Sequence, residues 1–216
     1  IHMKKALILL ITPFIALPLL PSKASEKPNI IFIFSDDMGY GDLGYTGSSQ
    51  IKTPHLDKLA KEGVFFPQAY VTASVCGPSR AGMLTGRYQQ RFGFETNPRG
   101  GPHLRPEKIG LPDRELTLGN RMQEAGYHTA AIGKWHMGHA SDDRRPGFDY
   151  WLSFKGQGKY YPPNDTYTIN DNGKRVPQDG YITTLLTRKA IKFLKETDRD
   201  KPFFLYLSHK AVHGPL

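Results

Sequence analysis

Residues 29–35 read Asn-Ile-Ile-Phe-Ile-Phe-Ser, an unbroken run of β-branched and aromatic side chains. Such a run is typical of a strand that is buried on both faces of a parallel sheet. Two carboxylates, Asp36 and Asp37, follow it directly. Adjacent carboxylates at a strand end repel each other and lose hydration, so a hard cation such as calcium or magnesium between them would stabilise both. The alternative is a solvated turn in which one aspartate caps the next element.

Strands and helices alternate along the rest of the chain. Helix signals cover 53–63, 78–84, 116–125 and 181–195, and strand signals cover 64–71, 128–132 and 203–207. This alternation predicts an α/β fold with a largely parallel sheet. Stretches rich in Gly, Pro and Asn at 97–112 and 156–180 are predicted to be loops over the carboxyl edge of that sheet, where such folds bind ligands.

The amino terminus has the organisation of a secretory signal. Lys4 and Lys5 precede an apolar run over 6–20, and Ser22-Lys23-Ala24 places small residues where a signal peptidase reads them. The run is shorter than the roughly 20 residues that span a bilayer and holds two prolines, which favours a cleaved signal over a membrane anchor. We therefore expect a signal peptide over 1–24, a mature chain over 25–216, and a secreted or periplasmic protein with no stable membrane anchor.

Composition limits the classes of function. Of the 216 residues, 38% are hydrophobic, enough for a core, and only 23% are charged, too few for a disordered chain. The single cysteine excludes a disulfide framework and a thiolate zinc cluster, so a metal would need oxygen and nitrogen ligands. Loss of the signal lowers the formal charge from +9 to +6, because it carries Lys4, Lys5 and Lys23 and no acidic residue. The remaining basic residues are scattered, which argues against nucleic acid as a partner.

The cysteine lies in the segment Cys76-Gly-Pro-Ser-Arg80, at the start of a predicted helix. The free N–H groups and dipole of a helix N-terminus stabilise anions, and Arg80 adds a forked cation one turn on. This pattern indicates a site for an oxyanion beside a nucleophile. The alternative is a small buried cysteine with a packing role only.

Four segments, in order, resemble the type I or formylglycine-dependent sulfatases, of which the arylsulfatases are examples. The signature Cys-x-Pro-Ser-Arg-x-x-x-Leu-Thr-Gly matches 76–86, and the other three segments are 28–42, 133–138 and 202–215. Together they extend over essentially all of the mature chain. The resemblance implies an alkaline-phosphatase-like sandwich with a largely parallel central sheet flanked by helices. It also implies hydrolysis of organic sulfate esters.

The resemblance assigns a nucleophile and a metal. It implies that a separate formylglycine-generating or sulfatase-maturing enzyme oxidises Cys76 to formylglycine during export. One hydroxyl of the hydrated aldehyde would attack sulfur and expel the alcohol, and the other would collapse to the aldehyde and release sulfate. Asp36 and Asp37 would bind one calcium ion, which residue 76 also contacts.

The same family pattern assigns the residues that hold the anion. Arg80 would steady the hydrate and the metal-side carboxylates, while Lys134 and His136 would hold sulfate and hydrate oxygens. Lys134 and His136 are two residues apart, so on an extended segment their side chains point the same way. His213 would contact the sulfate or assist the leaving oxygen. His209, four residues earlier, is expected to have a supporting or structural role.

The sequence departs from the family pattern at its carboxyl end. Type I sulfatases complete the calcium site with an Asp-Asn or Asp-Gln pair and add a further sulfate-binding lysine, both downstream of the position of His213. The sequence ends at Leu216. Calcium takes about six to eight oxygen ligands, so two aspartates and a hydrate would underfill its site. We therefore expect 25–216 to be an incomplete, N-terminal part of a sulfatase catalytic domain.

The substrate is expected to be a sulfated sugar or polysaccharide, or another sulfated small molecule. The aromatic segments Tyr150-Trp151 and Lys159-Tyr160-Tyr161 either stack on a sugar ring or pack a loop. Two other functions stay open. One is a phosphatase, phosphodiesterase or phosphonate hydrolase of the same fold, and the other is a secreted remnant that binds anions without turnover.

Overall fold

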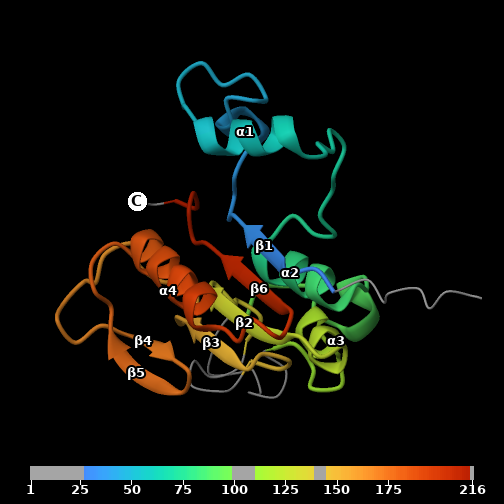
Figure 1. The fold of residues 1–216 in the computed structure, drawn as a ribbon, viewed down its shortest axis with the longest axis vertical. Helices are drawn as coiled ribbons and strands as arrows, with labels where there is room; N and C mark the ends of the chain where they lie inside the picture. The colour runs from blue at the N-terminus through green and yellow to red at the C-terminus, as the bar shows by residue number, and fades with distance from the viewer. Residues whose placement is uncertain (1–26, 99–109, 139–144, 215–216) are drawn as a thin grey trace, which may run out of the picture.

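A computed structural model describes residues 27–98, 110–138 and 145–214, and in them six strands form one sheet (Figure 1). The strands are β1 (Ile30–Phe34), β2 (His128–Gly133), β3 (Tyr150–Ser153), β4 (Thr168–Asp171), β5 (Lys174–Pro177) and β6 (Phe203–Ser208). Their order is β1-β6-β2-β3-β4-β5. The first four in that order are parallel, whereas β4 and β5 are antiparallel additions at one edge. The prediction of a largely parallel sheet is confirmed.

Helices pack on both faces of this sheet. The helices on it are α2 (Cys76–Thr85), α3 (Leu118–Glu124) and α4 (Ile182–Glu196), whereas α1 (Pro54–Glu62) lies away from it (Figure 1). Two short 3-10 turns, η1 (Tyr40–Asp42) and η2 (Gln89–Phe92), complete the helical elements of the described residues. Side chains of β6 alternate between two cores: Phe204 and Tyr206 pack with α2 and α3, whereas Leu205 and Leu207 pack with α4. The result is the predicted sandwich of helices around a central sheet.

Several predicted elements lie where the sequence places them. Strands β2 and β6 and helix α4 match their predicted ranges to within a residue or so. Helix α2 begins at Cys76, earlier than the predicted start at Pro78. Helix α3 begins after Thr117, whose hydroxyl accepts from the Asn120 N–H at 3.3 Å while the Asn120 side-chain oxygen accepts from the Thr117 N–H at 2.9 Å. This reciprocal cap explains the sharp start of that helix.

The prediction that the first strand is buried on both faces is wrong. Strand β1 lies at the edge of the described sheet and pairs only with β6. Its side chains alternate, and Ile31 and Ile33 are 48% and 56% exposed. A continuous apolar run therefore marks a strand here but does not place it in the sheet centre, because an edge strand has one neighbour.

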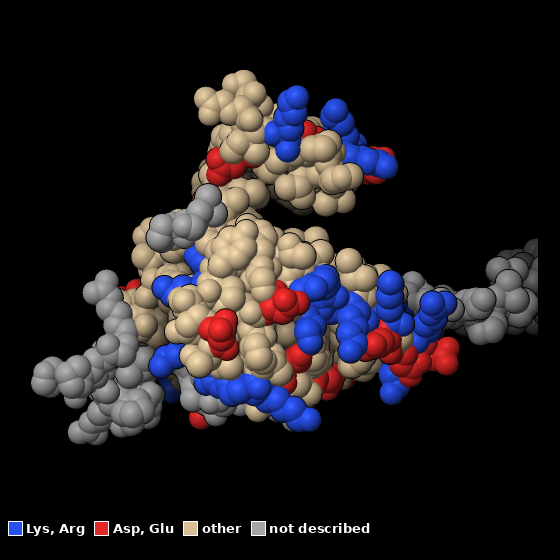
Figure 2. Space-filling model, turned by 90° about the vertical axis from the view of Figure 1, so that its left-hand side faces the viewer, with Lys and Arg blue, Asp and Glu red and all other residues tan. Residues whose placement is uncertain are grey.

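The predicted strand over 64–71 is also wrong. These residues are irregular, and Val64, Phe66 and Tyr70 are 80%, 72% and 85% exposed. They belong to an arm, residues 38–75, which includes α1 and stands clear of the sheet (Figures 1 and 2). A run with high β-propensity forms a strand only where it finds a strand to pair with, and none of the described strands lies beside this one.

A hairpin lies within the segment 156–180, which the sequence predicts to be loop. Strands β4 and β5 meet at Asn172 and Gly173, whose φ angles are 52° and 88°. Both values are left-handed, as a two-residue hairpin turn requires, and Asn-Gly is the favoured pair for it. The Asn-Gly step was the available signal for these two strands.

One glycine fixes how closely β2 and β6 approach. Gly133 ends β2 with a φ of 115°, and a Cβ at this position would overlap the carbonyl oxygen of Ser208. The next residue, Lys134, donates its backbone N–H to that same oxygen at 2.8 Å. The close approach therefore carries the pairing of the two strands one residue beyond β2.

Some predictions fall outside the described residues or concern the surface. The predicted signal peptide over 1–24 and most of the predicted loop over 97–112 lie outside them. Within 27–98, 110–138 and 145–214, no helix has the length and apolar character needed to cross a bilayer. On the face drawn in Figure 2, acidic side chains lie among the basic ones.

Candidate active site

The carboxyl ends of three neighbouring strands bring the predicted site residues to one edge. Asp36 and Asp37 follow β1, Lys134 and His136 follow β2, and His213 follows β6. Because parallel strands end at the same edge, residues far apart in the sequence meet there. Helix α2 adds Cys76 and Arg80 from its first turns.

At the centre of this edge lies a buried ionic cluster of Asp36, Arg80 and Lys134. Arg80 and Lys134 are 0% exposed and Asp36 is 3% exposed. Arg80 Nη2 donates to one carboxylate oxygen of Asp36 at 3.0 Å, and Lys134 Nζ donates to the other. Burial alone would raise the pKa of Asp36, but the hydrogen bond from Lys134 and the charge of Arg80 outweigh it and hold the pKa below its usual range. Two cations on one carboxylate leave a surplus positive charge, which favours a bound anion.

The guanidinium of Arg80 is held in place by the sheet beneath it. Its Nη1 donates to the Lys134 carbonyl and the Tyr206 hydroxyl, each at 3.1 Å, and to the Ser208 hydroxyl. The ring of Phe34 lies 4.9 Å from the guanidinium carbon. Arg80 is therefore a rigid partner of Asp36 whose geometry is set by β2 and β6.

Cys76 lies at the start of α2 with polar side chains around its sulfur. His136 Nδ1 is 3.2 Å from Sγ, and His136 has a left-handed φ of 53°. Burial, followed by the positive charges of Lys134 and Arg80, lowers the pKa of His136 to about 4. The imidazole beside Cys76 is therefore neutral at ordinary pH.

Asp37 and His213 form a separate rim pair at the solvent side of the site. Asp37 has a φ of 58° and a side chain that is 63% exposed, and its Oδ2 lies 3.5 Å from His213 Nε2. The segment that carries His213 runs beside the end of β1: the Asp36 N–H donates to the Ala211 carbonyl, and the Val212 N–H donates to the Asp36 carbonyl, both at 2.9 Å. The backbone thus brings His213 to Asp37.

An open cavity of about 410 Å³ joins part of the predicted set. Asp36, Asp37, Cys76 and Arg80 line it, together with parts of β1 and of the segment that precedes α2. The other three predicted residues do not line it. Lys134 reaches it through Asp36, His136 through Cys76, and His213 through Asp37.

The donors in this cavity suit a hard cation in kind but not in number. Asp36 and Asp37 offer carboxylate oxygens, which calcium prefers, yet both oxygens of Asp36 already accept hydrogen bonds from cations. In the part of the chain that the structure describes, no three His, Cys, Asp or Glu side chains form a metal-binding group. The described residues therefore supply only part of a calcium site.

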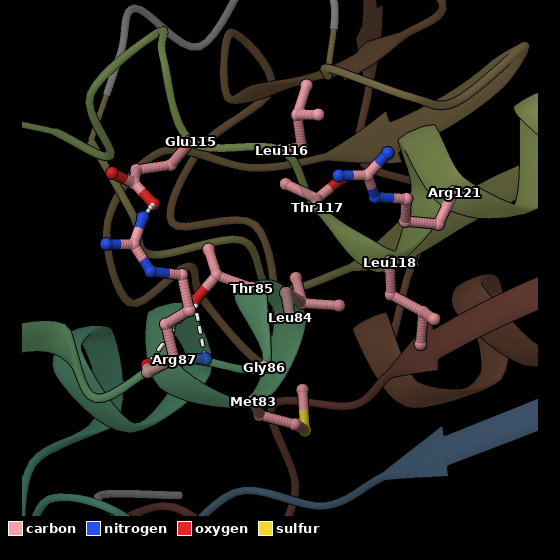
Figure 3. Close-up of a pocket in the computed structure, with 10 residues that line it drawn as sticks. All are labelled: Met83, Leu84, Thr85, Gly86, Arg87, Glu115, Leu116, Thr117, Leu118 and Arg121. Atoms are coloured by element: carbon pink, nitrogen blue, oxygen red, sulfur yellow. Dashed lines mark hydrogen bonds and ion pairs between the residues drawn. The ribbon is translucent and has the colours of Figure 1, made fainter.

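Two other cavities contain none of the predicted site residues. One, of about 300 Å³, lies between the C-terminal end of α2 and the start of α3, where Arg87 pairs with Glu115 at 2.5 Å (Figure 3). The other, of about 370 Å³, lies between α4 and the sheet beside Tyr150 and Lys189. Neither is lined by a cysteine or by fully buried cations such as Arg80 and Lys134.

Two amide side chains at the site escaped the sequence analysis. Asn97 Nδ2 lies 3.6 Å and Gln157 Nε2 lies 3.8 Å from Cys76 Sγ. Gln157 stands between Gly156 and Gly158, whose φ angles are 57° and 68°. A polar side chain between two glycines in a loop was the signal for Gln157, whereas Asn97 carries no comparable signal.

The aromatic segments near the site are mostly packed. Trp151 and Tyr160 are 8% and 5% exposed, and the Tyr150 hydroxyl donates to Asp171 at 2.8 Å. Tyr160 stacks on Tyr181 and donates to the His213 carbonyl at 2.9 Å. Of the aromatic side chains in these two segments, Tyr161 alone is largely exposed, at 66%.

The chain is similar in sequence to known sulfatases. The chain is 35% identical to N-acetylgalactosamine-6-sulfatase of Mus musculus, over 93% of this chain and 43% of the relative. It is 36% identical to N-acetylglucosamine-6-O-sulfatase of Bacteroides thetaiotaomicron, over 88% of this chain and 31% of the relative. The chain thus spans less than half the length of these relatives.

The fold of the chain is also similar to solved structures. Ps i-CgsB in complex with k-i-k-neocarrahexaose superposes with a TM-score of 0.78 at 37% identity, covering 88% of this chain and 46% of that one. A protein solved in complex with its substrate D-glucosamine-2-N,6-O-disulfate gives 0.74 at 36% identity, covering 87% and 35%. The sulfatase family model matches residues 28–216, and the chain belongs to the sulfatase family.

Proposed function

We propose that the protein to which this chain belongs hydrolyses organic sulfate esters, with residue 76 as the nucleophile. The observation that supports this most is the position of Cys76, in one cavity with Asp36 and Arg80, which together with Lys134 form a buried cluster of two cations and one carboxylate. A sulfate ester carries one negative charge, which the surplus charge of the cluster would balance. In this proposal 25–216 is the N-terminal part of the catalytic domain, and 1–24 is a signal peptide that directs export.

The described side chains divide the work between them. Lys134 and Arg80 set the charge and shape of the anion site, because both are buried and held by the sheet. The neutral imidazole of His136 lies at 3.2 Å from residue 76, within reach to exchange a proton with its reacting group. His213 Nε2 lies 3.5 Å from Asp37 Oδ2 in the rim pair, where a leaving alcohol would depart.

Two groups that these residues would hold complete the proposal. In the formylglycine form, produced by a maturing enzyme during export, residue 76 offers a hydrated aldehyde in place of a thiol. Asp36, Asp37 and an oxygen at residue 76 would hold a calcium ion, which supplies positive charge beside the sulfate. Ligands from elsewhere in the polypeptide would be needed to reach about six to eight oxygens.

The expected substrates are sulfated sugars or polysaccharides. The proteins that support this are N-acetylgalactosamine-6-sulfatase and N-acetylglucosamine-6-O-sulfatase, whose names specify sulfated amino sugars. Tyr161 is the exposed aromatic side chain that is available to stack on a sugar ring, because Trp151 and Tyr160 are packed.

The test begins with the covalent state of residue 76. The full-length protein, expressed with a maturing enzyme, should yield a tryptic peptide over 62–80 with formylglycine at residue 76, detected by mass spectrometry. Chromogenic aryl sulfate and aryl phosphate are then compared as substrates. A peptide that carries only the thiol would favour an anion-binding protein without turnover, and preference for the phosphate ester would favour a phosphatase.

A further inference from the structure

Two amide side chains present their NH₂ groups to the reacting position. Asn97 Nδ2 and Gln157 Nε2 lie 3.6 Å and 3.8 Å from Cys76 Sγ. They come from different parts of the chain: Asn97 follows η2, and Gln157 follows β3. Both residues are partly buried.

The orientation of each amide is fixed by its oxygen end. Asn97 Oδ1 accepts from the Gly77 backbone N–H at 2.7 Å, and Gln157 Oε1 accepts from the Lys134 ammonium. A backbone N–H and an ammonium only donate, so neither amide can turn its NH₂ group toward them. The NH₂ groups must therefore face residue 76.

The position of Gly77 shows how closely Asn97 is fitted. A Cβ at residue 77 would lie 2.9 Å from Asn97 Oδ1 and 2.8 Å from the His136 carbonyl oxygen. Only a glycine lets the first turn of α2 approach both segments at this distance. The contact between Asn97 and residue 76 is therefore a feature of the folded backbone.

More hydrogen-bond donors surround residue 76 than the sulfur of a thiol can accept from. With His136 Nδ1 at 3.2 Å, three polar groups surround one sulfur atom, and sulfur is a weak acceptor. A carbon that bears two oxygens would offer each group a stronger partner. The free aldehyde has only one oxygen, so it would offer these groups fewer hydrogen-bond partners.

We infer that Asn97 and Gln157 form a donor pair that holds the oxygens of residue 76 and favours the hydrated over the free aldehyde, an inference that rests on the proposed function. Hydration adds one water across the C=O bond: its oxygen bonds to carbon, and a proton passes to the former carbonyl oxygen. Each amide N–H then donates to one of the two oxygens. The pair keeps residue 76 in the state that can attack a sulfate ester.

Two single variants test the pair in the full-length, matured protein. Gln157→Met and Asn97→Leu remove one donor each at nearly constant volume. Asn120→Leu is matched to Asn97→Leu, because Asn120 also accepts a backbone N–H, that of Thr117. Gln123→Met is matched to Gln157→Met, because Gln123 lies on the exposed side of α3, where it donates to Asp149.

The first readout needs no turnover. A hydroxylamine probe reacts with the free aldehyde to give an oxime and water, and mass spectrometry of the 62–80 peptide follows the rate. Loss of one donor should speed trapping by about 2- to 10-fold. The two α3 variants should trap at the wild-type rate.

The second readout separates kcat from KM with an aryl sulfate. Each site variant should lower kcat by about 2- to 10-fold, with KM within a few-fold of wild type, because the loss of one donor leaves less of residue 76 in the hydrated state that attacks the ester. If Asn97→Leu fails to fold, Gln157→Met decides alone.

The outcomes separate the two proposals. Wild-type trapping rates and kcat in a folded Gln157→Met overturn the donor pair and leave the proposed function standing. A wild-type protein that forms no oxime and hydrolyses no aryl sulfate overturns the proposed function and the donor pair with it.

Discussion

Two adjacent aspartates belong to regions of opposite character. Asp36 is buried in the ionic cluster, where Arg80 and Lys134 occupy both of its oxygens. Asp37, in the rim pair, has a side chain that is 63% exposed and lies 3.5 Å from His213. The cluster is thus built by the fold and rigid before any ligand arrives, whereas the rim is open. Two adjacent aspartates of one motif can therefore divide into a buried half that is tied into the fold and an exposed half that is open to solvent.

The largest effect is expected at Cys76, which lines the same cavity as Asp36 and Asp37. Cys76→Ala in the full-length protein should lower kcat for an aryl sulfate by about 10⁴-fold or more, because it removes the proposed nucleophile. The melting temperature should change little, since the side chain is small and only partly buried. Parallel measurements of kcat and thermal unfolding check this. Substantial turnover in this variant would show that Cys76 is not the nucleophile.

The same chemical change at the two aspartates should have very different effects on stability. Asp36→Asn should lower the free energy of unfolding by about 3–5 kcal/mol, because it leaves two buried cations without their anion. Asp37→Asn, the matched control, should change it by less than about 0.5 kcal/mol. Urea unfolding of both full-length variants measures the difference. Equal effects at the two residues would mean that the cluster and the rim are not distinct.

Calcium binding should depend on the aspartate of the rim pair. Asp37→Asn should weaken calcium binding by about tenfold or more, because the loss of one carboxylate charge lowers the affinity of an oxygen site. Titration calorimetry on the full-length protein measures this, with Asp179→Asn, at an exposed surface pair, as the control. Activity should also fall when the metal is chelated. Unchanged affinity in Asp37→Asn would take Asp37 out of the metal site.

The smallest effect is expected at His209, on the segment that leads from the cluster to the rim. Burial lowers the pKa of His209 below its usual value of 6.5, so the folded protein holds it neutral. The unfolded chain binds the proton more readily, so this stability is present above pH 6.5 and is lost as pH falls below it. Between about pH 7.5 and 5.5, wild type should lose up to about 1 kcal/mol more than His209→Gln.

A control for that measurement lies on the arm. His55→Gln, on the exposed helix α1, should keep the wild-type dependence of unfolding free energy on pH. If His209→Gln and wild type have the same dependence, burial of His209 contributes nothing to the acid sensitivity of the fold.

The sequence predicted the framework of the site better than its contacts. Strands β2 and β6 and helices α2 and α4 follow from local periodicity and turn residues, which are properties of short segments. The positions of Asp36, Cys76 and Lys134 at one sheet edge follow from the parallel order of the strands. What local pattern could not give was the neighbour of each element: β1 is an edge strand, and 64–71 has no strand to pair with.

The contacts that were missed depend on tertiary distance. Asn97 and Gln157 reach Cys76 from segments that are 21 and 81 residues away in the chain, and no spacing rule connects them. The packing of Trp151 and Tyr160 likewise depends on what the fold brings beside them. The sequence did contain a signal for β4 and β5, the Asn172-Gly173 turn. These short strands lie in a segment rich in Gly, Pro and Asn, a composition that predicts a loop.

The close approach at Gly133 has a consequence for reading variants of this chain. A side chain at 133 would collide with the backbone of β6, so selection for folding alone is enough to keep glycine there. Residue 76 is under no such steric demand, since its side chain lines an open cavity. In a mutant library sorted only for soluble expression, position 133 would stay fixed and position 76 would drift. A substitution at position 133 therefore indicates a chain that cannot fold, whereas a substitution at position 76 indicates a chain that folds and lacks the proposed nucleophile.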